Sequence, residues 1–169
     1  MTEVILIGNG TSVLDYELGS AIDAYKTVVR FNNFQTKNYE KHVGTKTNVW
    51  FTCGEKHKQS INDFDSVVFH SWADEQNCSI YKNLKKLRPD TIKLQQRHIE
   101  NTQVKYPSTG LLAIMYFLEK QDSITIYGFD WWEKEDHHYA DNEIRGTLHN
   151  PLDEHEVIKK LGNRIKFLR

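Results

Sequence analysis

The sequence predicts a three-layer α/β fold in which a mostly parallel sheet lies between helices. Short apolar runs recur along the chain and alternate with segments of helical pattern. This alternation is typical of a sheet that helices cover on both faces. Polar residues gather where the apolar runs end, at Asn9, Asn32, His70 and Asp130. In an open α/β sheet this edge is the one that binds ligands.

The whole chain, residues 1–169, is predicted to form a single domain. This length suits one hydrophobic core, and the sequence shows neither an internal repeat nor a linker. The formal net charge is -1 and only three prolines occur. Such a chain offers no positive field for nucleic acid, and its composition is not that of a disordered protein. We therefore expect a folded protein that binds no nucleic acid.

The first element is a strand at Val4–Ile7, where four consecutive branched apolar residues indicate burial on both faces. Gly8 and Gly10 carry no Cβ, so we expect the backbone there to turn sharply and to approach a ligand closely. Thr11 and Ser12 are expected to cap the turn or helix that follows. Such a corner binds anions in many proteins, but many other α/β proteins begin with this turn and bind nothing there.

The remaining elements follow from the same apolar pattern and from turn residues. Pro89 and Asp90 end a predicted helix over 79–87, and Pro107 precedes an apolar helix over 111–120. Further strands are predicted at 26–31, 47–51, 66–69, 91–94 and 124–127, a last helix at 152–161, and an edge strand at 164–168.

A basic cluster lies on the predicted helix over 79–87 and just after it, at Lys82, Lys85, Lys86 and Arg88. It forms either a solvated face or an attachment patch for an anionic membrane that carries a lipid-linked substrate. Peripheral contact with a membrane therefore stays open.

The apolar start of the chain is too short for a signal peptide, and no apolar run approaches membrane-spanning length. Cys53 and Cys78 are too few for a disulfide scaffold and make no metal pattern. The expected setting is the reducing cytoplasm.

Two places along the chain are candidates for binding or catalysis. Ser108, Thr109 and Gly110 begin the apolar helix, whose free N–H groups suit a phosphate or a carboxylate. Plain capping by Ser108 or Thr109 explains the same residues without a ligand. His149 stands just before a helix start at Asn150-Pro151. A histidine there is either a general base near neutral pH or a surface residue.

No metal site is expected. The candidate cluster is Asp136-His137-His138-Tyr139 with Asp141, but adjacent histidines of an extended chain point to opposite faces, so they do not easily share one ion. Asp63-Phe64-Asp65 precedes a strand and is interpreted as a turn at the edge away from the ligand. The aromatic pair Trp131-Trp132 fits either a wall that stacks on a sugar or a piece of the core.

Four motifs, taken in order, resemble those of the sialyltransferases of glycosyltransferase family 29 and, more distantly, of the bacterial family 42 enzymes. They span nearly the whole chain. The Gly8-Asn9-Gly10 opening and Phe129-Asp130 lean toward family 42. The large motif is similar to Val4–Phe51, the small motif to Tyr106–Phe129, the third motif to His137-His138-Tyr139, and the very small motif to His149 and Glu154.

The resemblance implies a Rossmann-like sheet of the GT-A-variant type. It also implies transfer of a nonulosonic sugar, sialic acid, from its CMP donor with inversion. Asn9 and Asn32 would hold the cytidine nucleotide, beside the turn at Gly8 and Gly10. The helix start would bind nucleotide and donor through side chains and amides, at Ser108, Thr109 and Gly110.

The resemblance also assigns the chemistry. His138, with His137 as the second choice, and Tyr139 would stabilise the departing phosphate. His149 would be the base that takes the proton from the acceptor hydroxyl, and Glu154 would support that end of the site. The acceptor would be the terminal sugar, often a galactoside, of a surface glycan or of its lipid-linked oligosaccharide precursor.

A CMP sugar has one phosphate, so a histidine, hydroxyls and a helix start could offset its charge without a metal or a further cofactor. Two features depart from the animal enzymes: Val4 and Gln121 stand where those enzymes have a disulfide, and little sequence lies between the motifs. The alternatives are a transferase that uses CMP-Kdo and a CMP-binding module without transfer. A nicotinamide-dependent oxidoreductase fits poorly, because Val13 stands where its fingerprint needs a third glycine.

Overall fold

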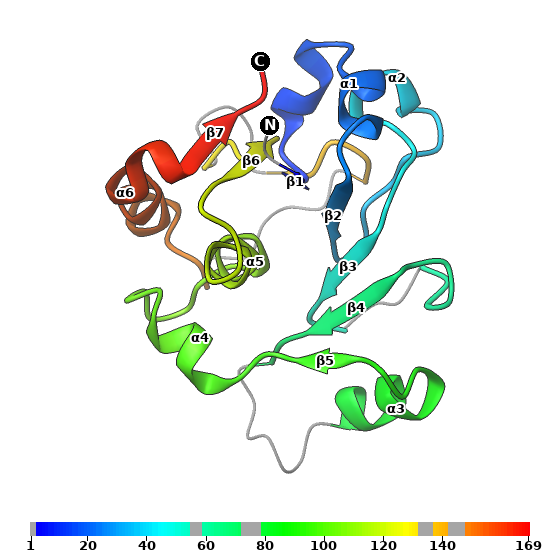
Figure 1. Cartoon of the computed structure of the whole chain (residues 1–169), viewed down its shortest axis with the longest axis vertical. Helices are drawn as coiled ribbons and strands as arrows, with labels where there is room; N and C mark the ends of the chain where they lie inside the picture. The colour runs from blue at the N-terminus through cyan, green and yellow to red at the C-terminus, as the bar shows by residue number, and fades with distance from the viewer. Residues whose placement is uncertain (1–2, 55–58, 72–78, 132–136, 142–147) are drawn as a thin grey trace.

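The computed structural model of the chain describes residues 3–54, 59–71, 79–131, 137–141 and 148–169. Within these residues the strands are β1 (Val4–Ile7), β2 (Thr27–Phe31), β3 (Val49–Thr52), β4 (Ser66–Phe69), β5 (Ile92–Lys93), β6 (Ile124–Tyr127) and β7 (Ile165–Phe167). They pair in parallel in the order β5-β4-β3-β2-β1-β6-β7 (Figure 1). The predicted parallel sheet is confirmed, and β7 lies at its edge as expected.

Some helices follow the sequence pattern and others do not. The α-helices are α1 (Gly19–Asp23), α2 (Glu40–Val43), α3 (Ser79–Leu87), α4 (Gln96–Glu100), α5 (Thr109–Leu118) and α6 (Pro151–Leu161), with 3-10 turns at Thr11–Asp15 and Gly162–Arg164. The predicted bounds of α3 are confirmed, and α5 and α6 begin slightly earlier than expected. The sequence does not predict α1, α2 and α4, because four or five residues are too few to show a helical period.

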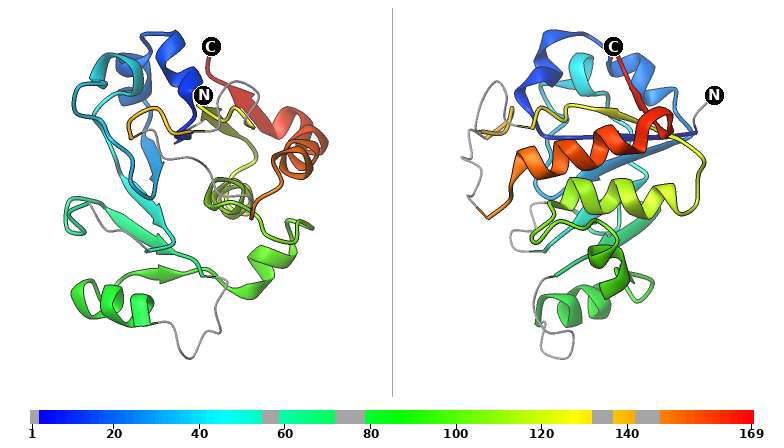
Figure 2. Two further views of the ribbon diagram at one scale, coloured as in Figure 1. Left: turned by 180° about the vertical axis from the view of Figure 1, so that it is seen from behind. Right: turned by 90° about the vertical axis from the view of Figure 1, so that its left-hand side faces the viewer.

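Helices cover both faces of the sheet, which confirms the three-layer architecture (Figure 2). Leu6 and Phe51 face α5 and α6, where they pack with Leu112 and Ile158. Alternate strand residues such as Ile5 point to the other face, which α1, α2 and the first 3-10 turn cover. The apolar runs are buried on both faces, as the central strands of a parallel sheet require.

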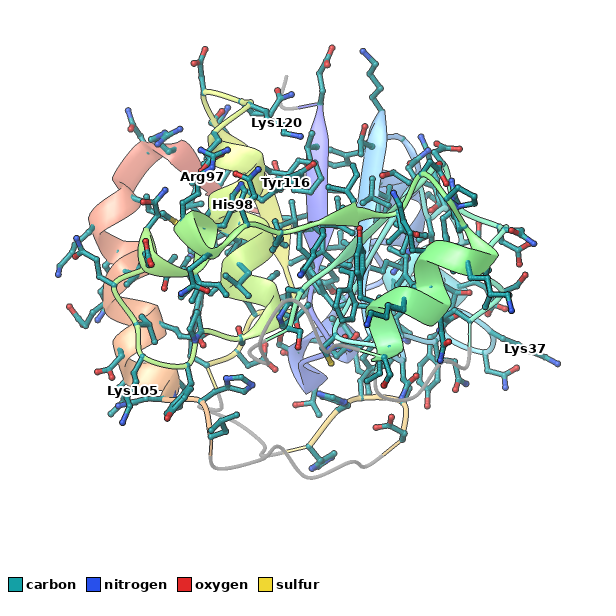
Figure 3. The ribbon with its side chains drawn as sticks, turned by 90° about the horizontal axis from the view of Figure 1, so that it is seen from below. Lys37, Arg97, His98, Lys105, Tyr116 and Lys120 are labelled. Carbon is teal, nitrogen blue, oxygen red and sulfur yellow. The ribbon has the colours of Figure 1, made fainter. Side chains whose placement is uncertain are left out.

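All strands of the sheet end at the same edge, and α5 and α6 begin there. In Figure 3 the arrow of β1 points to the end of the molecule where Lys105 lies, just before α5, whereas Lys120 follows α5 at the opposite end. The buried His98, whose Nε2 lies 3.4 Å from the Glu119 carboxylate, belongs to that opposite end. The carboxyl edge of the sheet is therefore where the predicted site residues can meet.

The basic cluster on α3 is partly used within the protein. The Arg88 guanidinium donates to the carbonyl of Ile61 at 2.9 Å, and Lys85 donates to the carbonyl of Thr91 at 3.3 Å. Lys82 and Lys86 are exposed. Contact with a membrane stays a prediction. In the ranges that the structure describes, no helix has both the length and the apolar character needed to cross a bilayer.

Candidate active site

Asn9 lies two residues after the end of β1, and its side chain reaches the end of β2. Its Nδ2 donates to the carbonyl of Phe31 at 3.3 Å. Its Oδ1 is buried and accepts no hydrogen bond from the residues that the structure describes, and the same holds for Thr11 Oγ1. A buried acceptor without a donor costs free energy. A ligand that donates a hydrogen bond here would therefore be stabilised.

Asn32 connects the ends of two strands to the start of α5. Its φ of 46° lies in the left-handed region, which asparagine tolerates better than most residues. Its Oδ1 accepts from the N–H of Cys53 at 3.1 Å, and its Nδ2 donates to Thr109 Oγ1 at 3.3 Å. The predicted residues at the end of β2 and at the start of α5 thus lie in direct contact.

His70, at the end of β4, lies on the other side of the same threonine. Its Nε2 is 2.7 Å from Thr109 Oγ1, and its side chain is buried. Burial lowers the pKa of His70 to about 4, and the charge of His149 adds to this effect. His70 is therefore a neutral imidazole near pH 7, close enough to His149 to be influenced by its charge.

Ser108 joins the starts of α5 and α6. As predicted, it is the N-cap of α5, where its Oγ accepts from the N–H of Leu111 at 3.2 Å. Its own N–H and hydroxyl both donate to the Glu154 carboxylate, at 2.6 and 2.7 Å. Burial raises the pKa of Glu154, whereas the hydrogen bonds from Ser108 and the charge of His149 act in the opposite direction.

This contact changes what Ser108 offers to a ligand. Its two donors are already used by Glu154, so its predicted contact with a donor sugar stays a prediction. The N–H groups of Thr109 and Gly110 belong to the first turn of α5, where an α-helix has no internal acceptor for them. These amides are the part of the helix start that best suits an anion.

His149 precedes α6, whose N-cap is Asn150. The Asn150 side chain accepts from the N–H of Leu152 at 3.1 Å, and Pro151 occupies the first helical position, which explains the abrupt helix start. The imidazole Nδ1 of His149 lies 2.7 Å from the carbonyl oxygen of Tyr106. The ring is thus oriented by the segment that leads into α5.

The segment 137–141 docks onto the loop after β1. The N–H of Tyr139 donates to the carbonyl of Asn9 at 3.1 Å, and its buried hydroxyl donates to the carbonyl of Gln35. His138 Nδ1 lies 3.6 Å from the Asp141 carboxylate. The structure makes Tyr139 an anchor of this segment, so contact of Tyr139 and His138 with a phosphate stays a prediction.

Gly8 and Gly10 let the loop after β1 pass close to the loop after β6. Neither glycine has a left-handed φ, so close approach, and not an unusual backbone conformation, is what requires them. A Cβ at Gly8 would lie 2.3 Å from the carbonyl oxygen of Gly128, and one at Gly10 would lie 2.3 Å from Asp130 Oδ2. The loop after β6 lies too close to leave room for a side chain at either glycine. Contact of Gly8 and Gly10 with the CMP-sugar donor stays a prediction.

Ser12 holds these two loops together instead of capping a helix. The N-cap of the first 3-10 turn is Gly10, which makes no side-chain cap, so the predicted capping by Thr11 or Ser12 is wrong. The N–H of Ser12 donates to Asp130 Oδ2 at 3.0 Å, and its hydroxyl donates to Oδ1. Asp130 accepts these bonds from a residue 118 positions away.

Gly8→Ala is expected to lower the free energy of unfolding by about 3 kcal/mol, the upper end of the usual cost of overpacking. The clash is with a backbone carbonyl oxygen, which no side-chain rotation can remove. Urea denaturation monitored by circular dichroism measures the effect. Gly162→Ala is the matched control: a Cβ there meets nothing within 4 Å, and only its φ of 56° costs about 1 kcal/mol. Equal losses in both variants would contradict the predicted clash.

The sequence model described as glycosyltransferase family 29 (sialyltransferase) matches residues 2–77 and 57–165. The chain belongs to glycosyltransferase family 29. The resemblance to this family is thereby confirmed, and the assignment of single motif residues stays a prediction.

Relatives of this family 29 chain are only distantly similar. It is 26% identical over 160 residues to the CMP-N-acetylneuraminate-β-galactosamide-α-2,3-sialyltransferase 1 of Gallus gallus, a match that covers 81% of this chain and 47% of the relative. It is 41% identical over 73 residues to a β-1,6-galactosyltransferase of Arabidopsis thaliana, covering 43% of this chain and 15% of the relative. The chain thus spans about half the length of the chicken relative, and less of the plant one.

The fold also matches a solved structure. A crystal structure of a mammalian sialyltransferase superposes with a TM-score of 0.77 at 21% sequence identity, over 98% of this chain and 68% of that chain. This likeness shows that the Rossmann-like, GT-A-like arrangement of the sheet is that of a sialyltransferase structure.

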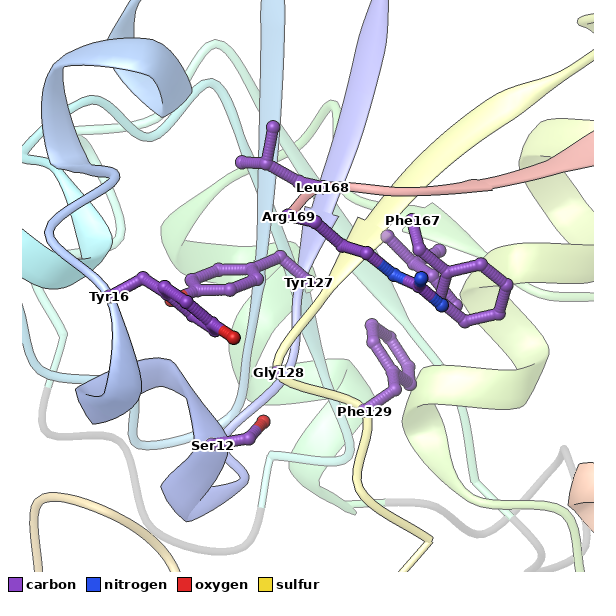
Figure 4. A pocket seen from close by; sticks show the side chains of 9 residues that line it. Ser12, Tyr16, Tyr127, Gly128, Phe129, Phe167, Leu168 and Arg169 are labelled. Carbon is purple, nitrogen blue, oxygen red and sulfur yellow. The ribbon is translucent and has the colours of Figure 1, made fainter.

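A small pocket of this family 29 chain, of about 140 Å³, lies beside the candidate site (Figure 4). It opens between the loop after β6 and the end of β7, with Tyr16, Phe129, Phe167 and Arg169 among its walls. None of the predicted site residues lines it. The Gly128–Phe129 segment forms its border toward the loop after β1.

Three features that the sequence singled out lie apart from these contacts: the tryptophan pair, the possible metal ligands and the turn at 63–65. Trp131 is half-buried and stacks on His155 with ring centroids 4.4 Å apart, so it packs within the protein, and Trp132 lies outside the described residues. Among the described residues no group of three histidines, cysteines, aspartates and glutamates could hold a metal; Asp136 lies outside them. The turn at 63–65 precedes β4, as interpreted from the sequence.

Proposed function

We propose that this chain transfers sialic acid from CMP-sialic acid to a hydroxyl group of a glycan. His149 would act as the base in a single inverting displacement that needs no metal. Family membership supports the sialyltransferase reaction, and the mechanism is inferred from the residues at the carboxyl edge of the sheet. The single observation that carries the mechanism is the hydrogen bond between His149 and the Tyr106 carbonyl.

A carbonyl oxygen only accepts hydrogen bonds, so His149 Nδ1 must carry a proton. In the neutral ring the other nitrogen, Nε2, then has its lone pair available as a base. The chain thus selects the tautomer that a general base requires and holds the ring by its opposite side. A surface histidine without this contact would exchange between both tautomers.

The placement of His149 supports the same role. Its charge influences both His70, which contacts Thr109, and Glu154, which contacts Ser108. The base therefore lies near the start of α5, whose amides suit the donor phosphate. A base on one side and an anion-binding helix start on the other fit a direct displacement at the sugar carbon.

Metal independence follows from the charge of the donor. A CMP sugar carries one phosphate, and the amides of Thr109 and Gly110 with the His138 imidazole would offset the charge that develops on it. The acceptor would be the terminal sugar of a glycan or of a lipid-linked oligosaccharide. CMP-Kdo remains the alternative donor, since the same groups would bind its nucleotide.

CMP is expected to raise the melting temperature of the protein in the presence of EDTA, because a ligand that binds only the folded state stabilises it. Differential scanning fluorimetry with CMP and with UMP, both in EDTA, makes the measurement. UMP is the matched control, because it carries the same phosphate and differs from CMP only in the base. An equal shift with UMP would contradict recognition of the cytosine, and a CMP shift that needs divalent ions would contradict metal independence.

A further inference from the structure

The hydroxyl of Thr109 is held between the buried side chain of His70 and the half-buried side chain of Asn32. His70 Nε2 lies 2.7 Å from Thr109 Oγ1, and Asn32 Nδ2 lies 3.3 Å from the same atom. The two partners come from the ends of β4 and β2, and Thr109 is the first residue of α5. Three elements of the sheet edge therefore converge on a single hydroxyl group at the helix start.

The orientation of Asn32 fixes one of these hydrogen bonds. Its Oδ1 accepts from the N–H of Cys53 at 3.1 Å, so its Nδ2 is the atom that faces Thr109. An amide nitrogen only donates. Thr109 Oγ1 thus accepts from Asn32, which fills one of its two lone pairs.

The protonation of His70 decides whether the Thr109 hydroxyl proton stays available for another acceptor. A neutral imidazole carries one proton, on either Nε2 or Nδ1. If Nε2 carries it, the second lone pair of Thr109 is filled and the threonine proton is left to donate elsewhere. If Nε2 carries no proton, the threonine hydroxyl donates its hydrogen bond to His70 and cannot donate one to an anion.

We propose that His70 is a positioning residue that donates its Nε2 proton to Thr109 and thereby turns the Thr109 hydroxyl proton toward the phosphate of the CMP donor. The inference rests on the proposed function, because it names the phosphate of that donor. An anion only accepts hydrogen bonds, and the neighbouring amides of Thr109 and Gly110 also donate. With His70 in this tautomer, all of these groups present protons to one anion.

The tautomer can be measured in the unaltered protein. Long-range ¹H–¹⁵N correlation spectra of the imidazole nitrogens, recorded near pH 7 with CMP and assigned with His70→Gln, distinguish a protonated Nε2 from a protonated Nδ1. We expect the Nε2–H form. The Nδ1–H form would overturn the proposal, because the Thr109 proton would then be used by His70.

Binding of CMP and of cytidine, which lacks the phosphate, separates the role of His70 from packing. His70→Leu is expected to weaken CMP binding by about 10- to 100-fold, the range for a lost hydrogen bond to a charged group, and to leave cytidine binding unchanged. His70→Gln keeps an N–H donor and should keep CMP affinity within about threefold. Calorimetry measures the dissociation constants of CMP and of cytidine for the unaltered protein and both variants.

A double variant tests whether His70 acts through Thr109. Thr109→Val should weaken CMP binding as much as His70→Leu, and the two together should cause no further loss. Equal weakening of CMP and cytidine, or additive losses, would show a packing role and overturn the proposal. If the unaltered protein binds neither ligand, the proposed function fails and this inference with it. If it binds CMP and His70→Leu binds equally well, only the role of His70 is overturned.

Discussion

His149→Ala is expected to lower the rate of sialyl transfer by about 10²- to 10⁴-fold, the usual contribution of a positioned general base, while CMP binds almost as before. The acceptor hydroxyl is a poor nucleophile until its proton is removed, and the Tyr106 carbonyl prepares the His149 ring for that task. Transfer from CMP-sialic acid to a galactoside measures the rate, and calorimetry measures the affinity for CMP.

The chain offers a matched control in His42. This half-buried histidine also has its Nδ1 on a carbonyl oxygen, that of Tyr16 at 2.9 Å, but it lies on α2. His42→Ala should leave the transfer rate unchanged. Unchanged transfer in His149→Ala would contradict its role as base. If the unaltered protein binds CMP but neither transfers nor hydrolyses CMP-sialic acid, the chain is a binding module.

The free energy of unfolding is expected to fall by about 3 kcal/mol as the pH is lowered from 6.5 to 4, because of His70. Burial lowers the pKa of His70 from 6.5 to about 4 in the folded state. Between these values the unfolded chain binds a proton that the folded chain does not. The stabilisation is therefore complete above pH 6.5 and is lost as the pH falls toward 4.

His70→Gln should remove most of this dependence, because glutamine does not titrate. Urea denaturation of both proteins at several pH values gives the difference between the two curves. The comparison is needed because burial raises the pKa of Glu154. Above the ordinary pKa value of 4.5, Glu154 therefore changes the free energy of unfolding with pH in the opposite sense to His70. That contribution is common to both proteins and cancels in the difference. A difference that stays constant from pH 6.5 to 4 would contradict the burial of a neutral His70.

The strands were accessible to sequence reasoning because their signal is local. Val4–Ile7 and Ile124–Tyr127 are runs of apolar and β-branched residues that match the observed β1 and β6. Pro107-Ser108 likewise indicates the start of α5. The positions of the polar residues at strand ends also predicted that Asn9, Asn32 and His70 would gather at one edge of the sheet.

The contacts that build the site were not accessible, because they join residues far apart in the chain. Ser12 contacts Asp130, which lies 118 positions further along the chain, whereas the local pattern around Ser12 suggests only a helix cap. His70 meets Thr109 over 39 positions, and its sequence context marks it merely as a polar residue after a strand. Only the relative placement of strands and helices reveals such partners.

The Glu154 bridge between α5 and α6 has a consequence for how such a transferase could diversify. One carboxylate fixes the spacing between the start of α5, which suits a phosphate, and the start of α6, which His149 precedes. Substitutions on the outer faces of either helix leave that spacing intact. If the proposed transfer takes place here, evolution could exchange the acceptor sugar while the distance between leaving group and base is inherited unchanged.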